Sequence, residues 1–263
     1  TMPEVEDLYL PYRPKRKTRS SVAIEKGLEP LAKKIYQQLP FDLEAAAEHF
    51  IDEKKGVSSI EEAIAGARDI IAEWVNENAI IRAGLRRMFI NDGIITSKII
   101  KGKEQEGNKF ENYFDWNEPV KKSPSHRILA IFRGENEGFL KVIIEPDTEE
   151  ALDFIDRKII TGNNAIADEV IDAYEDAYKR LLKPSIETEV RKHYKEQADR
   201  EAIEVFAENA RQLLMAAPLG QKNILAIDPG FRTGCKVVAL DKQGNLLHNE
   251  TIYPHPPESK VKE

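Results

Sequence analysis

From Ile186 to Ala217 the sequence contains neither glycine nor proline, and this run constrains the fold more than any other feature. Ser185, preceded by Pro184, predicts a fresh helix start with the serine as N-cap, and Pro218 predicts the end. A helix of this length is about 45 Å long and can span more than one domain. Its apolar stripe comprises Ile186, Val190, Tyr194, Ala198, Ile203 or Ala202, Phe206, Ala210, and Leu213 or Leu214.

Upstream of this run, apolar residues recur mostly with the period of an α-helix. The predicted helices lie at about 21–39 (broken at Gly27 and Pro30), 43–51, 60–78, 79–91, 126–133, 148–160 and 165–183, with N-caps at Asp42, Ser58, Ser125 and Asp147. Strand-like runs at 94–101 and 139–145 predict a small α/β element at about 94–145. The two helices that end at Gly93, in a C′ position, resemble a helix-turn-helix or winged unit.

The pattern changes at Lys222, where three short apolar runs predict an antiparallel meander over residues 222–253. The predicted fold class is therefore mainly α, with a multi-helix region, a small α/β element, a long scaffold helix and a terminal strand meander. The predicted domains are residues 1–183, the connecting helix at 184–220, and residues 221–263.

The composition excludes several classes of protein. The 46 acidic against 39 basic residues argue against a uniformly basic nucleic-acid-binding domain, although a local basic patch remains compatible. The single Cys235 excludes a disulfide framework and a cysteine-based zinc site, and a cytoplasmic location is expected. We expect no membrane span and no signal peptide. Motifs for nucleotide hydrolysis and zinc proteolysis are missing, so no small-molecule substrate is evident.

A basic segment near the start is the first candidate for binding nucleic acid. Residues 11–26 contain six basic residues and one acidic residue, although the whole chain is acidic. Basic clusters attract phosphate backbones, and Tyr9 and Tyr12 are placed to stack on bases. The alternative is a solvated loop that pairs with acidic helices of the same chain. The candidate side chains are Arg13, Lys15, Arg16, Lys17 and Arg19.

The predicted helix at 79–91 is the second candidate, through Arg82, Arg86 and Arg87. Arg82 and Arg86 share a face, since they are four residues apart, and a recognition helix presents such a face to phosphates. The alternative is ion pairing with acidic residues of the preceding helix, namely Asp69, Glu73 or Glu77.

Asp228 is the candidate metal ligand. It ends the strand ILAID and is followed by Pro229 and Gly230, which allows a close backbone turn. The alternative is that Asp-Pro-Gly is only a turn signal. One carboxylate does not build a two-metal nuclease site, so we expect no catalysis by this chain and no resident cofactor.

The segment ILAIDPGFRTGCKVVALDKQGNLL resembles the start of the YqgF/RuvC branch of the ribonuclease H-like fold. Together with DLYLPYRPKRKTRSSVAIEKGLEPLA and YFDWNEPVKKSPSHRILAIFRGENEGFLKV, it resembles the Tex family of bacterial transcription accessory proteins. The resemblance covers nearly the whole chain in order. It maps the first metal-binding aspartate of the ribonuclease H-like fold onto Asp228, a vestigial catalytic candidate that would bind Mg²⁺ only in a longer protein.

The resemblance implies a fragment that associates with RNA or DNA during transcription, with RNA polymerase or the ribosome as further expected partners. Family members carry helix-hairpin-helix repeats and a C-terminal RNA-binding domain that are absent here. The alternatives are a metal-dependent nuclease and a purely structural docking domain. A meander without its partner strands leaves an uncovered face and edge, so we expect it to be disordered, packed on the helices or paired with another copy.

Overall fold

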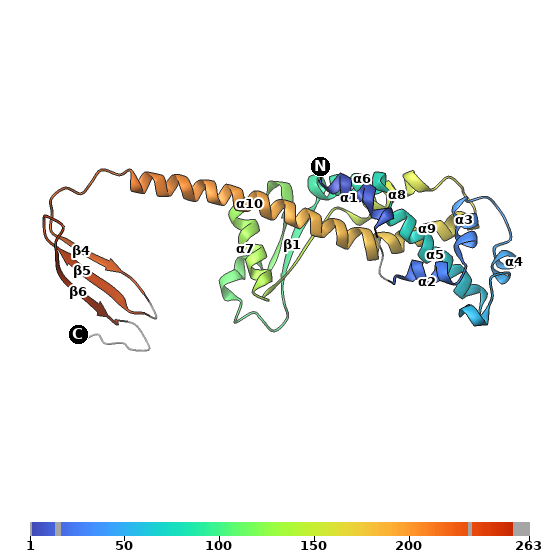
Figure 1. The fold of residues 1–263 in the computed structure, drawn as a ribbon, viewed down its shortest axis with the longest axis horizontal. Helices are drawn as coiled ribbons and strands as arrows, with labels where there is room; N and C mark the ends of the chain where they lie inside the picture. Colours follow the sequence, from blue (N-terminus) through green and yellow to red (C-terminus); the bar gives the residue numbers. More distant parts are fainter. Residues whose placement is uncertain (1, 14–16, 231–232, 255–263) are drawn as a thin grey trace. The chain divides into compact units, whose positions relative to one another are not determined.

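The computed structural model describes residues 2–13, 17–230 and 233–254 (Figure 1). The protein is mainly α-helical, which confirms the predicted fold class. It divides into two compact units, Thr1–Glu204 and Val205–Glu263. Within the described residues no helix is long and apolar enough to cross a membrane.

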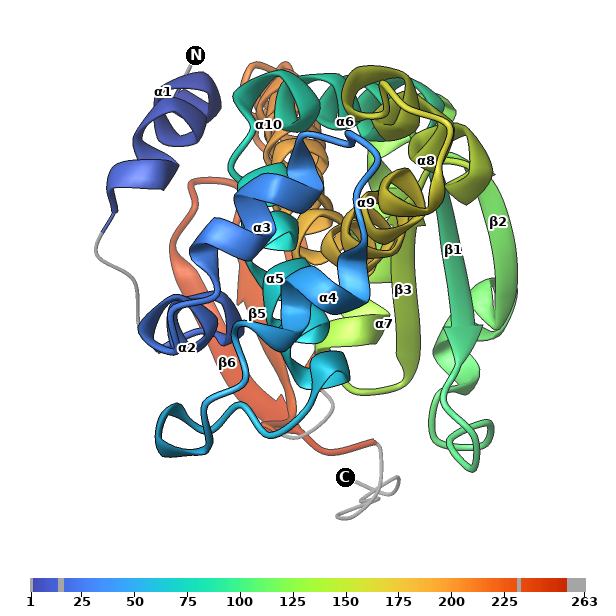
Figure 2. The ribbon, with the colours of Figure 1, turned by 90° about the vertical axis from the view of Figure 1, so that its right-hand side faces the viewer.

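The first unit is built around α5 (Ile60–Asn76), which makes its most extensive contacts with four other helices because it is apolar along much of its surface (Figure 2). Those helices are α2 (Arg19–Glu25), α3 (Glu29–Tyr36), α4 (Leu43–Glu48) and α9 (Ala165–Ala177). The other helices of this unit are α1 (Met2–Tyr9), α6 (Ala79–Asp92), α7 (Ser125–Asn136), α8 (Thr148–Ile159) and α10 (Lys183–Leu214), the last of which continues into the second unit.

Two predicted N-caps are confirmed and two are shifted by one residue. Asp42 and Asp147 accept hydrogen bonds from the first turns of α4 and α8. The N-cap of α5 is Ser59 and not Ser58. The hydroxyl of Ser58 instead donates a hydrogen bond to the Glu62 carboxylate. The N-cap position of α7 is Pro124, so Ser125 is already helical.

Gly93 follows α6 as predicted, but its φ of −62° is not left-handed. Glycine is needed there because a Cβ would lie 2.2 Å from the Phe89 carbonyl oxygen. The requirement is therefore a close approach between backbone segments, not a special backbone angle.

The predicted α/β element is a three-stranded antiparallel sheet covered on one face by α7. Its order is β2 (Asp115–Pro119), β1 (Ile94–Ile99), β3 (Leu140–Glu145). Alternate residues of β1 and β3 are buried, including Ile95 and Ile144, and α7 buries Ile131 against them. The sequence did not single out β2, because proline and acidic residues are atypical of strands.

The outer edge of β3 is closed by charged side chains of helices, not by another strand. The amide of Ile144 donates to Glu187 of α10 at 3.0 Å, and the amide of Val142 donates to Glu135 of α7 at 3.2 Å. Arg191 of α10 donates to the Val142 carbonyl and to both Glu135 oxygens, at 2.7 and 2.9 Å. These contacts satisfy backbone groups that an edge strand would otherwise expose.

The helix does not restart at Pro184 and Ser185, so that prediction was wrong. Helix α9 continues through a π-helical turn, Tyr178–Leu182, directly into α10. Proline has no amide hydrogen and its ring crowds the carbonyl four residues earlier. A π turn just before Pro184 widens the helix, so the chain passes the proline without ending.

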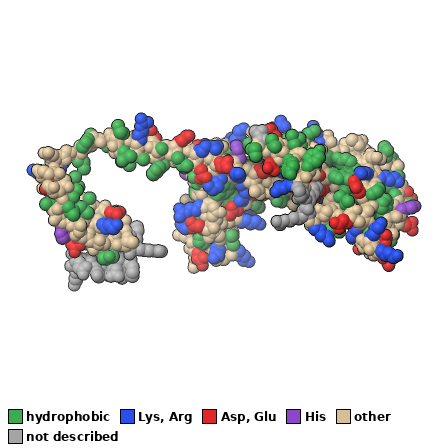
Figure 3. Space-filling view, in the orientation of Figure 1, with side chains coloured by type: hydrophobic (Ala, Val, Ile, Leu, Met, Phe, Trp, Pro, Cys, Tyr) green, Lys and Arg blue, Asp and Glu red, His purple; other side chains and the backbone are tan. Residues whose placement is uncertain are grey.

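The predicted stripe of α10 is buried only in its first half. The buried residues of the stripe are Ile186, Val190, Tyr194 and Ala198. Phe206 is 73% exposed, and most of the apolar residues that follow it are exposed too. Figure 3 shows hydrophobic side chains at the surface along the C-terminal part of this helix. Periodicity alone therefore identified the apolar face but not how far it is covered.

The second unit contains the predicted meander, which is confirmed as an antiparallel sheet of order β4-β5-β6. The strands are β4 (Ile224–Asp228), β5 (Cys235–Leu240) and β6 (Leu246–Ile252). The strands are paired in register except for one shift between Ala239 and Leu240, so the described meander is not disordered. Leu225 and Leu247 are more than 60% exposed, as an uncovered sheet requires.

Candidate nucleic-acid interface

The basic segment, residues 11–26, begins within the short 3-10 helix Leu10–Tyr12 and includes α2, whose first residue is Arg19. The hydroxyl of Thr18 caps α2 by accepting from the Ser21 amide at 3.0 Å. Of the five predicted basic residues, Arg13, Lys17 and Arg19 are exposed. Lys15 and Arg16 lie outside the described residues.

Two aromatic side chains lie next to these cations. Tyr9 is 52% exposed and Tyr12 is 80% exposed, although tyrosine rings usually bury much of their surface. Among the described residues, no ion pair engages Arg13 or Lys17. The segment therefore presents cations and aromatic rings to solvent together.

Next to this segment lies a shallow hollow, lined by Lys17, Arg19 and Lys26 and also by Asp69. Burial raises the pKa of the Asp69 carboxyl above its ordinary value, against the opposing effects of Arg180 and Arg19. The Lys26 ammonium donates to the Gly56 carbonyl at 2.6 Å, so it is partly engaged. Of these three lining cations, Lys17 and Arg19 are therefore exposed, whereas Lys26 is half-buried.

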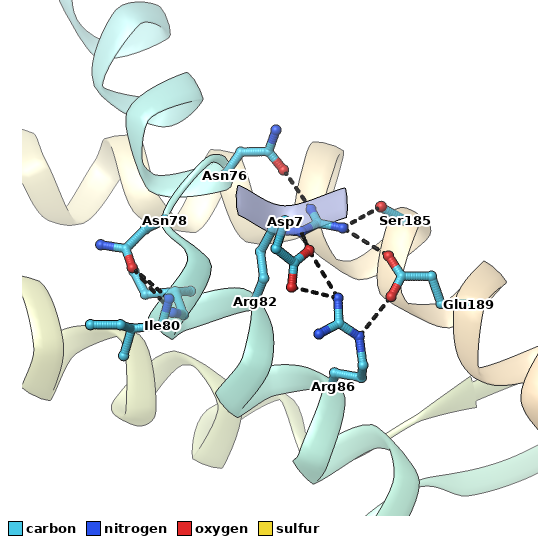
Figure 4. A network of polar contacts seen from close by, with 9 residues as sticks. Asp7, Asn76, Asn78, Ile80, Arg82, Arg86, Ser185 and Glu189 are labelled. Atoms are coloured by element: carbon cyan, nitrogen blue, oxygen red, sulfur yellow. Dashed lines mark hydrogen bonds and ion pairs between the residues drawn. The ribbon is translucent and has the colours of Figure 1, made fainter. Parts of the chain in front are cut away.

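Helix α6 places its candidate arginines differently. Arg82 is only 5% exposed, and its Nε donates to Asp7 of α1 at 2.6 Å (Figure 4). Its Nη2 donates to Glu189 at 2.8 Å and to Ser185 at 3.0 Å, both on α10. Arg82 therefore joins three helices in one buried network.

Arg86 completes this network one turn further along α6. Its Nε donates to Glu189 at 2.7 Å, and its Nη2 lies 2.8 Å from an Asp7 carboxylate oxygen. Burial opposes ionisation, but the hydrogen bonds to Glu189 and Asp7 raise the pKa of Arg86 above its ordinary value. The Asp7 and Glu189 carboxylates thus each form ion pairs with both guanidinium groups.

The network decides between the two interpretations of these arginines. In this conformation α6 does not present Arg82 and Arg86 as a recognition helix would, and of the three only Arg87 is exposed. Ion pairing was the alternative, but the partners are Asp7 and Glu189, not the acidic residues of the preceding helix. Sequence reasoning missed these partners because they are 75 and 107 residues away from Arg82.

Asp228 ends β4 and is exposed, opposite Lys236 in the antiparallel register. The close turn after it is real: a Cβ on Gly230 would lie 2.6 Å from the Gly234 carbonyl oxygen. Across the described part of the chain, no group of three or more His, Cys, Asp or Glu side chains is arranged to hold a metal ion. Asp228 is therefore placed at a strand end, as predicted, and belongs to no such ligand group among the described residues.

Fold and site together define a mainly α-helical protein with an exposed basic and aromatic segment and a separate strand meander. Residues 40–206 match the model of the Tex central region, and residues 222–263 match that of the Tex protein YqgF-like domain. The chain belongs to the Tex family, which confirms the resemblance found in the sequence.

Individual relatives agree with this assignment. The chain is 44% identical to the uncharacterized protein YdcI of Bacillus subtilis, over 99% of its own length and 37% of the relative's. It is 39% identical to the transcriptional accessory protein Tex of Neisseria gonorrhoeae, over 95% of the chain and 34% of that protein. It is 25% identical to the human S1 RNA-binding domain-containing protein 1, over 97% and 27%. The chain thus spans about a third of the length of the curated relatives it matches.

Proposed function

We propose that this chain contributes to a transcription accessory function by binding single-stranded nucleic acid through residues 9–19. The observation that carries the proposal is the joint exposure of Tyr9 and Tyr12 beside Arg13, Lys17 and Arg19. The names of two relatives, one a transcriptional accessory protein and one an S1 RNA-binding domain-containing protein, support this direction.

The chemistry of the segment favours a single strand over a duplex. Stacking of a base on an aromatic ring contributes about 1–3 kcal/mol and requires a base that is free of its partner. The logarithm of the binding constant falls linearly with the logarithm of the salt concentration, and each phosphate contact makes this slope steeper by about 0.7. Five contacts would therefore weaken binding about a hundred-fold between 50 and 200 mM salt.

Titration of the chain with a fluorescent single-stranded RNA, at both salt concentrations, tests the proposal. Replacing Arg13, Lys15, Arg16, Lys17 and Arg19 by glutamine should abolish the salt-dependent binding. The matched control replaces five other exposed lysines, at positions 54, 55, 101, 121 and 122, with the same change of net charge. Equal loss in both variants would mean that only net charge matters, and would contradict a specific segment.

The aromatic contribution is tested separately. Tyr9→Ala with Tyr12→Ala should weaken binding to the single strand by at least about thirty-fold while leaving binding to duplex DNA unchanged. The salt slope should stay the same, because no phosphate contact is removed. An unchanged affinity for RNA would refute stacking.

We propose that α10 acts as a scaffold between the helical unit and the strand meander, with RNA polymerase or the ribosome as a further partner. Its continuity through the π turn and its long charged surface support this role. Pull-down of purified RNA polymerase or ribosomes by the chain, before and after nuclease treatment, tests for a direct partner. Capture that survives nuclease supports direct docking, and capture that requires nucleic acid refutes it.

We further propose that the chain has no nuclease activity of its own, because Asp228 lies without described carboxylates that could complete a two-metal site. Incubating labelled RNA with the chain in Mg²⁺ or Mn²⁺ tests this. Cleavage that disappears in Asp228→Asn would favour the nuclease alternative and overturn the proposal.

A further inference from the structure

We infer that Arg82 and Arg86 form a second phosphate-binding site, which α1 covers and which nucleic acid uncovers by displacing the Asp7 carboxylate. This inference rests on the proposed function, since the displacing ligand is the same nucleic acid. The site lies beside the start of the basic segment, because Arg13 and Arg82 line the same hollow. Asp7 occupies the place that a phosphate group would take (Figure 4).

The first argument is the way in which α1 is attached. Asp7 is the buried residue of α1, whereas its apolar residues Met2, Val5 and Leu8 are between 59 and 72% exposed. A surface helix normally buries its apolar side and exposes its charges. Helix α1 does the reverse, so ion pairs and not apolar burial hold it against α6.

The second argument is energetic. Buried ion pairs contribute little net stability, because removing the charges from water offsets most of their attraction. A helix held mainly by such pairs is weakly attached. An incoming anion that replaces the Asp7 carboxylate can form the same ion pairs with Arg82 and Arg86. Arginine also binds phosphate in the same two-pronged geometry as it binds carboxylate.

The third argument is the charge and access around the contact. The sequence of α1, MPEVEDLY, contains three carboxylates and no basic residue. One hollow beside α1 is lined by Glu6, Arg13, Arg82 and Lys192, and another by Glu4, Arg86 and Arg87. Glu4 and Glu6 lie on opposite sides of Asp7 around the helix. Lifting α1 would therefore remove acidic groups and join two hollows over three arginines.

The test is the affinity of the full chain for a labelled single-stranded RNA at low salt. Asp7→Asn removes the competing charge and keeps the shape, so it should bind at least about three-fold more tightly than the unmodified chain. Adding Arg82→Gln and Arg86→Gln should reverse the gain. Glu44→Gln, an exposed acidic residue of α4, is the matched control for the change of net charge. A gain no larger than that of the control overturns the inference.

A second measurement needs no variant that could misfold. Amide hydrogen exchange of α1 in the unmodified chain should increase when inorganic polyphosphate is added, while exchange of α8 stays constant. Unchanged exchange of α1 overturns the covered site even if RNA binds through residues 13–19. Faster exchange of α1 with polyphosphate, in a chain that does not bind RNA, would refute the proposed function and support the covered anion site.

Discussion

Replacing Arg191 by alanine should destabilise the helical unit far more than the partial exposure of this side chain suggests. Arg191 is 26% exposed, yet its guanidinium donates to Glu135, to Glu187 and to the backbone carbonyl of Val142. It also lies 5.6 Å from the ring centroid of Phe132. Its removal therefore takes one donor from each of two carboxylates and removes the side-chain hydrogen bond to the Val142 carbonyl.

The magnitude follows from these contacts. Each hydrogen bond to a charged group contributes about 1.5–3 kcal/mol, and a contact with an aromatic face adds about 0.5–1 kcal/mol. Solvent screening of a partly exposed pair reduces the sum, so we expect a loss of about 3 kcal/mol. For a unit of this size, that corresponds to a decrease in Tm of roughly 6–12 °C.

Urea unfolding followed by circular dichroism measures the change. Arg133→Ala is the matched control, because Arg133 is 71% exposed and pairs with Glu137, the C-cap residue of the same helix. That variant should lose only about 0.3–0.5 kcal/mol. Arg191→Lys should fall between the two, since it keeps the charge and loses the forked geometry. Equal losses for Arg191→Ala and Arg133→Ala would refute the claim that this side chain closes the sheet edge.

Three further predictions concern other parts of the helical unit. Gln38→Ala should cost about 1–3 kcal/mol in urea unfolding, because the buried Gln38 side chain hydrogen-bonds three backbone groups at the end of α8 and just after it. A loss under about 0.5 kcal/mol would contradict this. Gly84→Ala should lower the Tm, because the new Cβ would lie 2.1 Å from the Phe154 ring, and adding Phe154→Leu should restore it. Burial and the nearby carboxylate of Glu145 raise the pKa of Tyr178 from 10.0 to about 12, so the folded state favours the neutral phenol. The free energy of unfolding should therefore fall as the pH rises from 10 to 12, and it should fall less steeply in Tyr178→Phe. Identical slopes of unfolding free energy against pH in the two proteins would refute the assignment.

Local signals in the sequence were read correctly where the interaction is itself local. Asp42 and Asp147 cap their helices because an N-cap bond spans only three residues. The strand meander was predicted for the same reason, since its pairs are neighbours in sequence. The cap of α5 was placed one residue early because Ser58 and Ser59 offer the same hydroxyl, and only the bond to Glu62 separates their roles.

Interactions between distant segments were beyond reach. The partners of Arg82 come from α1 and α10, and no local pattern connects these helices. The exposure of Phe206 could not be predicted either, because periodicity shows which face is apolar but not which neighbour covers it. The continuation of the helix through Pro184 depends on a π turn, for which the sequence carries no known local signature.

The π turn also means that the continuous helical segment of residues 165–214 must keep its number of residues. One residue inserted into an α-helix rotates all later residues by about 100° around the helix axis. The π turn accommodates one such extra residue. Upstream of it, α9 directs Val170 into the helical core, and downstream α10 directs Glu187 and Arg191 to the edge of the sheet. Deleting one residue between 178 and 182 would turn that edge-closing face away from β3. Substitutions in this turn should therefore be tolerated during evolution where single-residue insertions and deletions are not.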